Sequence, residues 1–137
     1  MKKLLSIVIS VILGVNVIDA ATTVTAKATK EDKSSLGVGT VQVHMVTGKT
    51  LGIFDSWSSA ESGETSSCTS NERNPQYSAS VISRADGYYF YQWQDAKGNK
   101  ITEKRSDRDV ENLTASTNSQ ITIYAIFKPI DISPEVS

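Results

Sequence analysis

His44 is the only histidine of this 137-residue chain and the first residue to test for chemistry. A single imidazole excludes a metal site built from several histidines, and nucleophilic catalysis would pair His44 with a serine or with Cys68, the only cysteine. Apolar residues alternate around it, at Val41, Val43 and Met45. This period of two predicts a strand that turns His44 away from the apolar face, as a surface or edge residue without a catalytic role.

The segment Thr47-Gly48-Lys49-Thr50 resembles the end of a phosphate-binding loop. That motif needs a glycine five positions before Gly48, where this chain has Val43, and it needs a helix after it. A short apolar segment, Leu51–Trp57, follows instead. The segment is therefore predicted to be a hairpin turn.

Acidic residues recur at Asp107, Asp109 and Glu111, with the spacing of a calcium loop. The neighbouring Lys104 and Arg105 and the missing loop glycine argue against calcium. A solvated charged loop is the simpler interpretation. We therefore expect a protein that is not an enzyme and has no catalytic, cofactor-binding or metal-binding residues.

The aromatic residues are unevenly distributed, since five of the ten lie between Tyr88 and Trp93. Strand alternation over this segment and over Ile121–Phe127 directs one set of side chains to the same outer side if the two strands pair. We call this predicted ligand-binding set the aromatic face: Tyr89, Tyr91, Tyr124 and Ile126. Exposed patches of this kind mark interaction sites, whereas the alternative is that Leu51–Trp57 folds back and covers the patch as a second small core.

Strand-like segments must position these residues, and the sequence contains several, with turn residues between them. The fold class is predicted to be mainly β, a small antiparallel or mixed, β-grasp-like sheet with long polar loops. The expected strands are a segment around Val41–Met45, then Leu51–Trp57, Tyr77–Arg84, Tyr88–Trp93 and Ile121–Phe127, the last ended by Pro129.

The first residues have the pattern of a signal peptide. Lys2 and Lys3 precede an apolar run, Leu4–Val15, that is shorter than the roughly 20 residues of a membrane-spanning helix. Cleavage after Ala26 fits the small-residue rule best, and Ala20 is the alternative. We expect a secreted, extracellular product, or a periplasmic one if the host has an outer membrane, with no membrane attachment after cleavage.

Composition divides the rest of the chain. After the signal peptide, 1–26, the polar residues 27–36 are predicted to form a flexible leader. Residues 37–130 are predicted to form a single β domain, and 131–137 a C-terminal tail. Within the domain, the Ser-rich and Glu-rich segment 58–75 predicts a disordered loop. The net charge of −1 gives no electrostatic reason to expect nucleic acid as a partner.

A family pattern runs through the second half: Gly87-Tyr88-x-Phe90-x-x-Trp93-x-Asp95, then Gly98-x-x-Ile101, Asn118 and Ile121–Phe127. With Gly39-Thr40-Val41-Gln42-Val43 before it, the chain from 39 to 128 resembles the internalin-type B-repeat, a β-grasp-like module of bacterial secreted and surface proteins. The chain departs from the family at Gln92, where a glycine is usual, at the insertion 58–75, and in having one copy rather than a tandem array.

The resemblance implies non-enzymatic spacer, adhesive or recognition roles at a bacterial surface. Together with the aromatic face, it predicts a secreted, non-catalytic binding or surface-interaction module. Its expected partner is a cell-wall polysaccharide or an extracellular protein. The alternative function is a small exported inhibitor or toxin-like effector that acts through the 58–75 loop.

Overall fold

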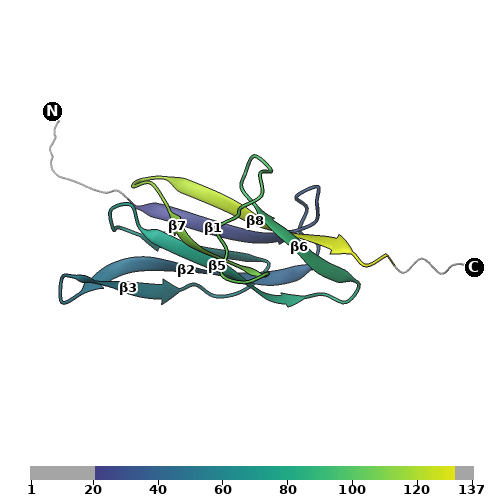
Figure 1. Ribbon diagram of the computed structural model, residues 1–137, viewed down its shortest axis with the longest axis horizontal. Coiled ribbons are helices and arrows are strands. Elements are labelled where there is room, and N and C mark those ends of the chain that lie inside the picture. Colours follow the sequence, from purple (N-terminus) through teal and green to yellow (C-terminus); the bar gives the residue numbers. More distant parts are fainter. Residues whose placement is uncertain (1–20, 132–137) are drawn as a thin grey trace, which may run out of the picture.

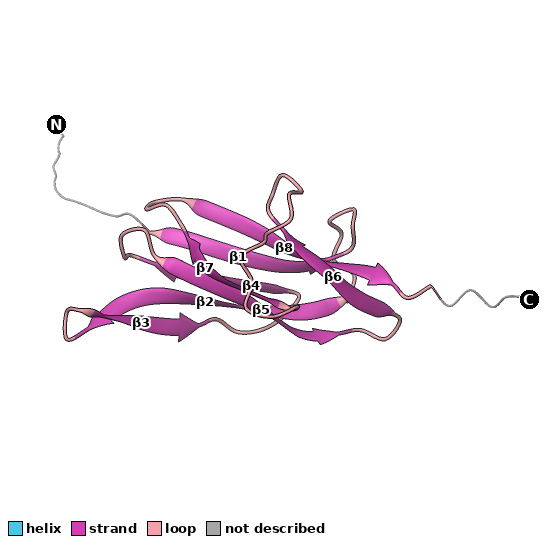
Figure 2. Cartoon of the chain, in the orientation of Figure 1, coloured by secondary structure: helices cyan, strands magenta, loops and turns pink. Residues whose placement is uncertain are grey.

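The computed structural model describes residues 21–131, which form eight strands in two four-stranded sheets (Figure 1, Figure 2). Sheet A has the strand order β4-β1-β8-β6, and sheet B has the order β3-β2-β5-β7. No helix of the described residues could span a membrane. The strands are β1 (Thr22–Thr29), β2 (Gly39–Thr50), β3 (Phe54–Ser59), β4 (Thr65–Ser70), β5 (Gln76–Arg84), β6 (Tyr88–Gln94), β7 (Asp109–Thr114) and β8 (Gln120–Pro129).

Sheet A is mixed and sheet B is antiparallel. In sheet A, β1 pairs in parallel with β8 and antiparallel with β4. The predicted mainly-β class with antiparallel and mixed pairing is confirmed. The predicted single sheet is divided in two, because the strand that begins at Gly39 lies in sheet B while β6 and β8 lie in sheet A. The opening and closing strands of the family pattern therefore face each other across the core.

The core lies between the sheets and follows the predicted alternation. Val41, Val43 and Met45 of β2 are fully buried in one cluster with Ile123 and Phe127 of β8. Phe127 of sheet A packs against sheet B at Gly39, where an added Cβ would lie 2.6 Å from Phe127 Cζ and 2.7 Å from the carbonyl oxygen of Ser83. A side chain at this position would therefore push backbone or a core ring aside.

β1 corrects the predicted N-terminal organisation. Residues 1–20 lie outside the described part of the chain, but Thr22–Thr29 form an internal strand of sheet A, with Val24, Ala26 and Ala28 fully buried. Cleavage after Ala26 would cut this strand, whereas cleavage after Ala20 would leave it whole. The predicted flexible leader at 27–36 instead contains the end of β1 and an ordered turn. Alternation of small apolar residues with Thr and Lys is a strand pattern, but the same alanines also fit a signal-peptidase site.

The predicted disordered loop at 58–75 is also replaced by strands. It contains the end of β3 and all of β4, whose only apolar side chain is Cys68. Buried serines take the place of apolar residues: Ser66 Oγ accepts the Val43 N–H at 3.0 Å, and Ser70 Oγ donates to the Val46 carbonyl at 2.7 Å. These bonds join β4 of sheet A to β2 of sheet B, so a polar sequence here is ordered by its hydrogen bonds.

The first hairpin turn lies further along the chain than predicted. β2 continues through the predicted turn at Thr47–Thr50 to its end, and the chain reverses at Leu51-Gly52. Both residues have positive φ, 56° at Leu51 and 73° at Gly52, and the Ile53 N–H bonds the Thr50 carbonyl at 3.2 Å. This is the geometry of a type I′ turn, which glycine and asparagine favour and leucine does not.

Candidate functional site

The structure brings the four residues of the aromatic face together, but it does not leave them all accessible. β6 pairs with β8, as the prediction required, with Tyr89 opposite Lys128 and Gln92 opposite Ile126. Tyr91 is an extra residue at a bulge in β6. Tyr89 and Tyr91 are exposed and Tyr124 is half-buried, but Ile126 is completely buried outside the main core cluster.

The turn between β1 and β2 covers this face. Lys33 Nζ donates to Gln94 Oε1 at 2.7 Å and lies 5.0 Å from the centre of the Tyr124 ring. Glu31 pairs with Lys128 at 3.4 Å. Since Tyr124 and Lys128 flank Ile126 on the same side of β8, these contacts place the segment 30–36 on the side of sheet A where Ile126 is buried. This covering segment lies within residues 27–36, which the sequence predicted to be a flexible leader.

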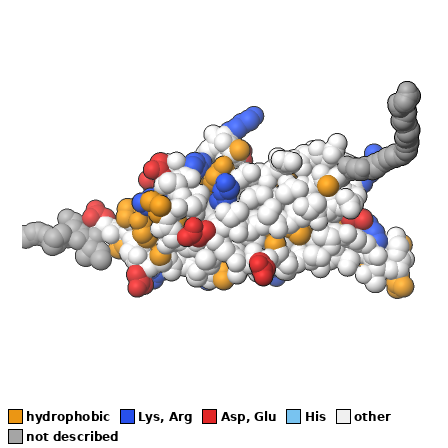
Figure 3. All heavy atoms as spheres, turned by 180° about the vertical axis from the view of Figure 1, so that it is seen from behind, with side chains coloured by type: hydrophobic (Ala, Val, Ile, Leu, Met, Phe, Trp, Pro, Cys, Tyr) orange, Lys and Arg blue, Asp and Glu red, His pale blue; other side chains and the backbone are white. Residues whose placement is uncertain are grey.

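The segment expected as the alternative cover is itself uncovered. Leu51 is 84%, Ile53 71% and Phe54 59% exposed, and together we call them the hairpin tip. Trp57 follows at 48% on the same hairpin. Figure 3 shows apolar side chains at the end of the elongated molecule where this hairpin lies (compare Figure 1). The alternative, in which Leu51–Trp57 covers the aromatic face, is wrong, because β3 lies in sheet B.

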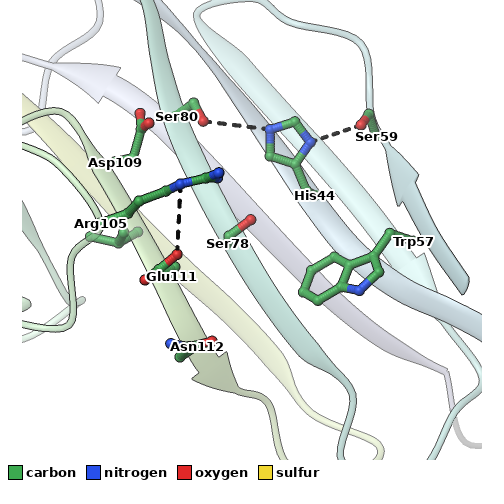
Figure 4. A pocket seen from close by; sticks show the side chains of 10 residues that line it. His44, Trp57, Ser59, Ser78, Ser80, Arg105, Asp109, Glu111 and Asn112 are labelled. Carbon is green, nitrogen blue, oxygen red and sulfur yellow. Dashed lines mark hydrogen bonds and ion pairs between the residues drawn. The ribbon is translucent and has the colours of Figure 1, made fainter. Parts of the chain in front are cut away.

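The outer side of sheet B carries a hollow of about 350 Å³ to which all four strands contribute (Figure 4). Trp57 and Ser59 of β3 form one side, and Arg105 with the residues of β7 forms the other. His44 of β2 and Ser78 of β5 lie between them. The remaining lining residues are Ser80, Asp109, Val110, Glu111 and Asn112.

His44 lies in this hollow with a serine on each side. It points away from Val41 and Val43, as predicted, but β2 is an inner strand of sheet B rather than an edge. Its Nδ1 lies 2.7 Å from Ser59 Oγ, and its Nε2 lies 3.5 Å from Ser80 Oγ. These bonds fix the imidazole plane on the floor of the hollow.

The His44 cluster does not have the hydrogen-bond arrangement of a Ser-His-Asp triad. A serine nucleophile needs histidine to accept its proton through one nitrogen and to be oriented by a carboxylate on the other. Here both nitrogens face hydroxyl groups. The backbone N–H groups of a sheet point along its ladder rather than outward, so this face does not present an oxyanion hole.

Charged side chains line the β7 side. The residues before β7 form a tight reversal, in which the Arg105 N–H bonds the Asp109 carbonyl at 3.1 Å. Arg105 Nε then lies 3.9 Å from Glu111 Oε1. Asp109 and Glu111, predicted to lie in a solvated loop, are therefore on a strand that borders the hollow. Between residues 21 and 131, no group of three or more His, Cys, Asp or Glu side chains is placed to hold a metal ion.

Cys68 does not contribute to either surface. It lies in β4 opposite Val24 and packs partly buried against the core. This burial raises the pKa of its thiol, so the reactive thiolate is less populated at neutral pH than in an exposed cysteine.

The sequence identified Trp57 as a large apolar residue of a strand but did not show which surface it lines. It did not single out Arg105, Glu111 or Asn112 as residues of a shared surface. The alternation Trp57-x-Ser59 was the available signal, because it puts both side chains on one side of a strand. Asn112 has φ of 58° at the bulge between β5 and β7, a position that the sequence does not mark.

No protein-family model and no curated protein matches this sequence. The resemblance to the internalin-type B-repeat is therefore not confirmed. Among solved structures, a pilus-presented adhesin, Spy0125 (Cpa), crystallised as a cysteine-to-alanine mutant, aligns with a TM-score of 0.38 and 8% identity. The alignment covers 86% of this chain and 31% of the adhesin chain, so this chain spans about a third of that protein.

Proposed function

We propose that this protein is a secreted, non-catalytic binding module of a bacterial surface, and that it binds through the β2–β3 hairpin and the outer side of sheet B. The observation that carries the proposal is the exposure of Leu51, Ile53, Phe54 and Trp57 on one hairpin, beside a hollow lined with polar side chains. Exposed apolar groups of this size next to a polar rim are typical of interaction surfaces.

The position of β1 supports the part of the proposal that concerns export. A mature chain that begins at Ala21, after cleavage at Ala20, contains every strand of both sheets. The resemblance to B-repeat modules agrees with a role at a cell surface, and the apolar run Leu4–Val15 agrees with export. The partner we propose is the cell-wall polysaccharide.

Sedimentation with insoluble cell-wall material tests this function. The chain from residue 21 to 137 is expected to sediment with wall fragments, and a variant with Leu51→Ser and Phe54→Ser is expected to stay in solution. The control is Tyr89→Ser with Tyr91→Ser, which removes two exposed rings on the other sheet. If the unchanged chain does not sediment, or if only the tyrosine variant loses binding, the proposed function is wrong.

A further inference from the structure

We infer that the hollow on the outer side of sheet B binds a short, uncharged oligosaccharide segment of the polysaccharide. This inference rests on the proposed function and adds the ligand class and the residues that recognise it. The site comprises the Trp57 ring on one side, His44 and Ser78 on the floor, and Asp109, Glu111 and Asn112 on the other side.

The chemistry of the lining fits a sugar ring. A pyranose has apolar C–H faces and a periphery of hydroxyl groups, so a site for it needs an aromatic surface and several hydrogen-bonding groups around it. Trp57 supplies an indole ring that is half-exposed at the wall of the hollow. Opposite it, two carboxylates can accept hydrogen bonds from sugar hydroxyl groups, and an amide can accept or donate them. Hydrogen bonds to the carboxylates are stronger than those to the amide.

The lining is held in place before a ligand arrives. Trp57 lies opposite Val46 in the β2–β3 ladder, and Val46 is only 3% exposed. His44 is fixed between Ser59 and Ser80, and Arg105 is directed by its contact with Glu111. Side chains on paired strands lose little further freedom on binding, which favours affinity in an open site.

The charge of the hollow selects the class of sugar. Arg105 is the only Lys or Arg that lines it, and its guanidinium already lies beside Glu111, which leaves Asp109 without a cationic partner in the hollow. An anionic polysaccharide would bring its charges toward this uncompensated carboxylate and would be repelled. A neutral sugar meets no such penalty.

The dimensions favour a short segment rather than a large surface. A volume of about 350 Å³ lies at the lower end of the range for small-molecule sites. The hollow is open to solvent and crosses the four strands of sheet B, so a chain of sugars can enter and leave it. The hairpin tip lies outside this lining and forms a separate contact.

Tryptophan fluorescence gives a direct measurement, because Trp57 is half-exposed while the other tryptophan, Trp93, is buried in the core. Chitotetraose, cellotetraose and maltotetraose serve as uncharged probes, and tetragalacturonate as the anionic probe. We expect at least one uncharged probe to change the fluorescence of the 21–137 chain with saturation. Tetragalacturonate is expected to bind at least about tenfold more weakly than that probe.

Variants then assign the site, with affinities measured by calorimetry. Trp57→Ala and Asp109→Asn are expected to weaken the best probe by about tenfold or more, whereas Tyr89→Ala, a matched ring on sheet A, is expected to leave affinity unchanged. Circular dichroism confirms that each variant is folded. The inference fails if no uncharged probe binds, if folded Trp57→Ala binds normally, or if protease treatment of the wall material abolishes sedimentation. In the first two cases the unchanged chain can still sediment with wall material, so the proposed function is judged separately. Loss of sedimentation after protease treatment would replace the polysaccharide by a wall protein as the partner and leave the surface-binding role in place.

Discussion

The aromatic side of sheet A and the β2–β3 hairpin of sheet B contain side chains of similar size, but they differ in what lies over them. On sheet A, Ile126 is fully buried, and the segment 30–36 contacts Tyr124 through Lys33. On sheet B, the hairpin tip and Trp57 have no cover in the described chain. An exposed apolar side chain loses the stabilisation of burial, so the open hairpin contributes less to folding than its composition would allow.

Backbone geometry sharpens this difference. Leu51 adopts φ of 56° in the turn, where a residue with a Cβ is destabilised by about 1–2 kcal/mol relative to glycine. A fold selected for stability alone would place Asn or Gly there. Strain at an exposed apolar residue agrees with the contact that we propose for the hairpin tip. On the covered side of sheet A the residue with positive φ is the polar Lys33, at 71°, and the apolar Ile126 is fully buried.

The largest effect is expected from removing the first half of β1, because the covered side depends on this strand. A chain that begins at Lys27 lacks the buried Val24 and Ala26 and most of the residues that pair with β4 and β8. We expect it to be unfolded by circular dichroism at 25 °C, while the chain that begins at Ala21 unfolds cooperatively in urea. A stable domain from Lys27 onward would show that β1 is dispensable.

Ile126→Ala is expected to have the next largest effect on stability. It tests whether the covered side of sheet A is packed as a second small core. A fully buried isoleucine replaced by alanine should lower the free energy of unfolding by about 2–5 kcal/mol. The same substitution at the exposed Ile82 is the control and should cost less than about 0.5 kcal/mol. Equal, small losses in urea denaturation would mean that the segment 30–36 does not pack on Ile126.

The strands with regular alternation could be predicted from sequence, and those with polar cores could not. β2, β5 and β8 alternate apolar residues with others, and β6 is marked by its aromatic content. β4 was missed because two of its three inward positions are Ser66 and Ser70, which form hydrogen bonds to β2 instead of packing as apolar residues. β1 was missed because its alternating alanines also match a cleavage site.

The sequence predicted the candidate site on sheet A, whereas the structure places the open surface on sheet B, and this error has a physical reason. Alternation tells which side of a strand a residue occupies, but not what lies over that side. The cover on sheet A depends on Lys33 reaching Gln94, 61 residues away, and a contact of this range leaves no local pattern. The hollow on sheet B likewise forms only because β7 pairs with β5. The sequence predicted a charged loop in place of β7.

Leu51→Asn should separate stability from binding at the open hairpin. Asparagine tolerates positive φ, so the free energy of unfolding is expected to rise by up to about 1 kcal/mol. Wall sedimentation is expected to fall because an apolar contact is lost. Ile53→Asn is the matched control, since Ile53 has no positive φ: it should weaken binding without the gain in stability. Unchanged sedimentation in both variants would exclude the tip as a contact.

The smallest effect is expected from Lys33→Ala, which asks whether the covered side of sheet A is a closed core or a hidden binding face. Loss of the contacts with Gln94 and Tyr124 should lower the free energy of unfolding by about 0.5–1 kcal/mol, with faster hydrogen exchange in residues 30–36. Lys97→Ala, in an exposed turn, is the control. Because Ile126 stays packed, wall sedimentation should be unchanged. Stronger sedimentation that a further Tyr124→Ser change removes would return the binding role to the aromatic face and reverse the assignment of the two sheets.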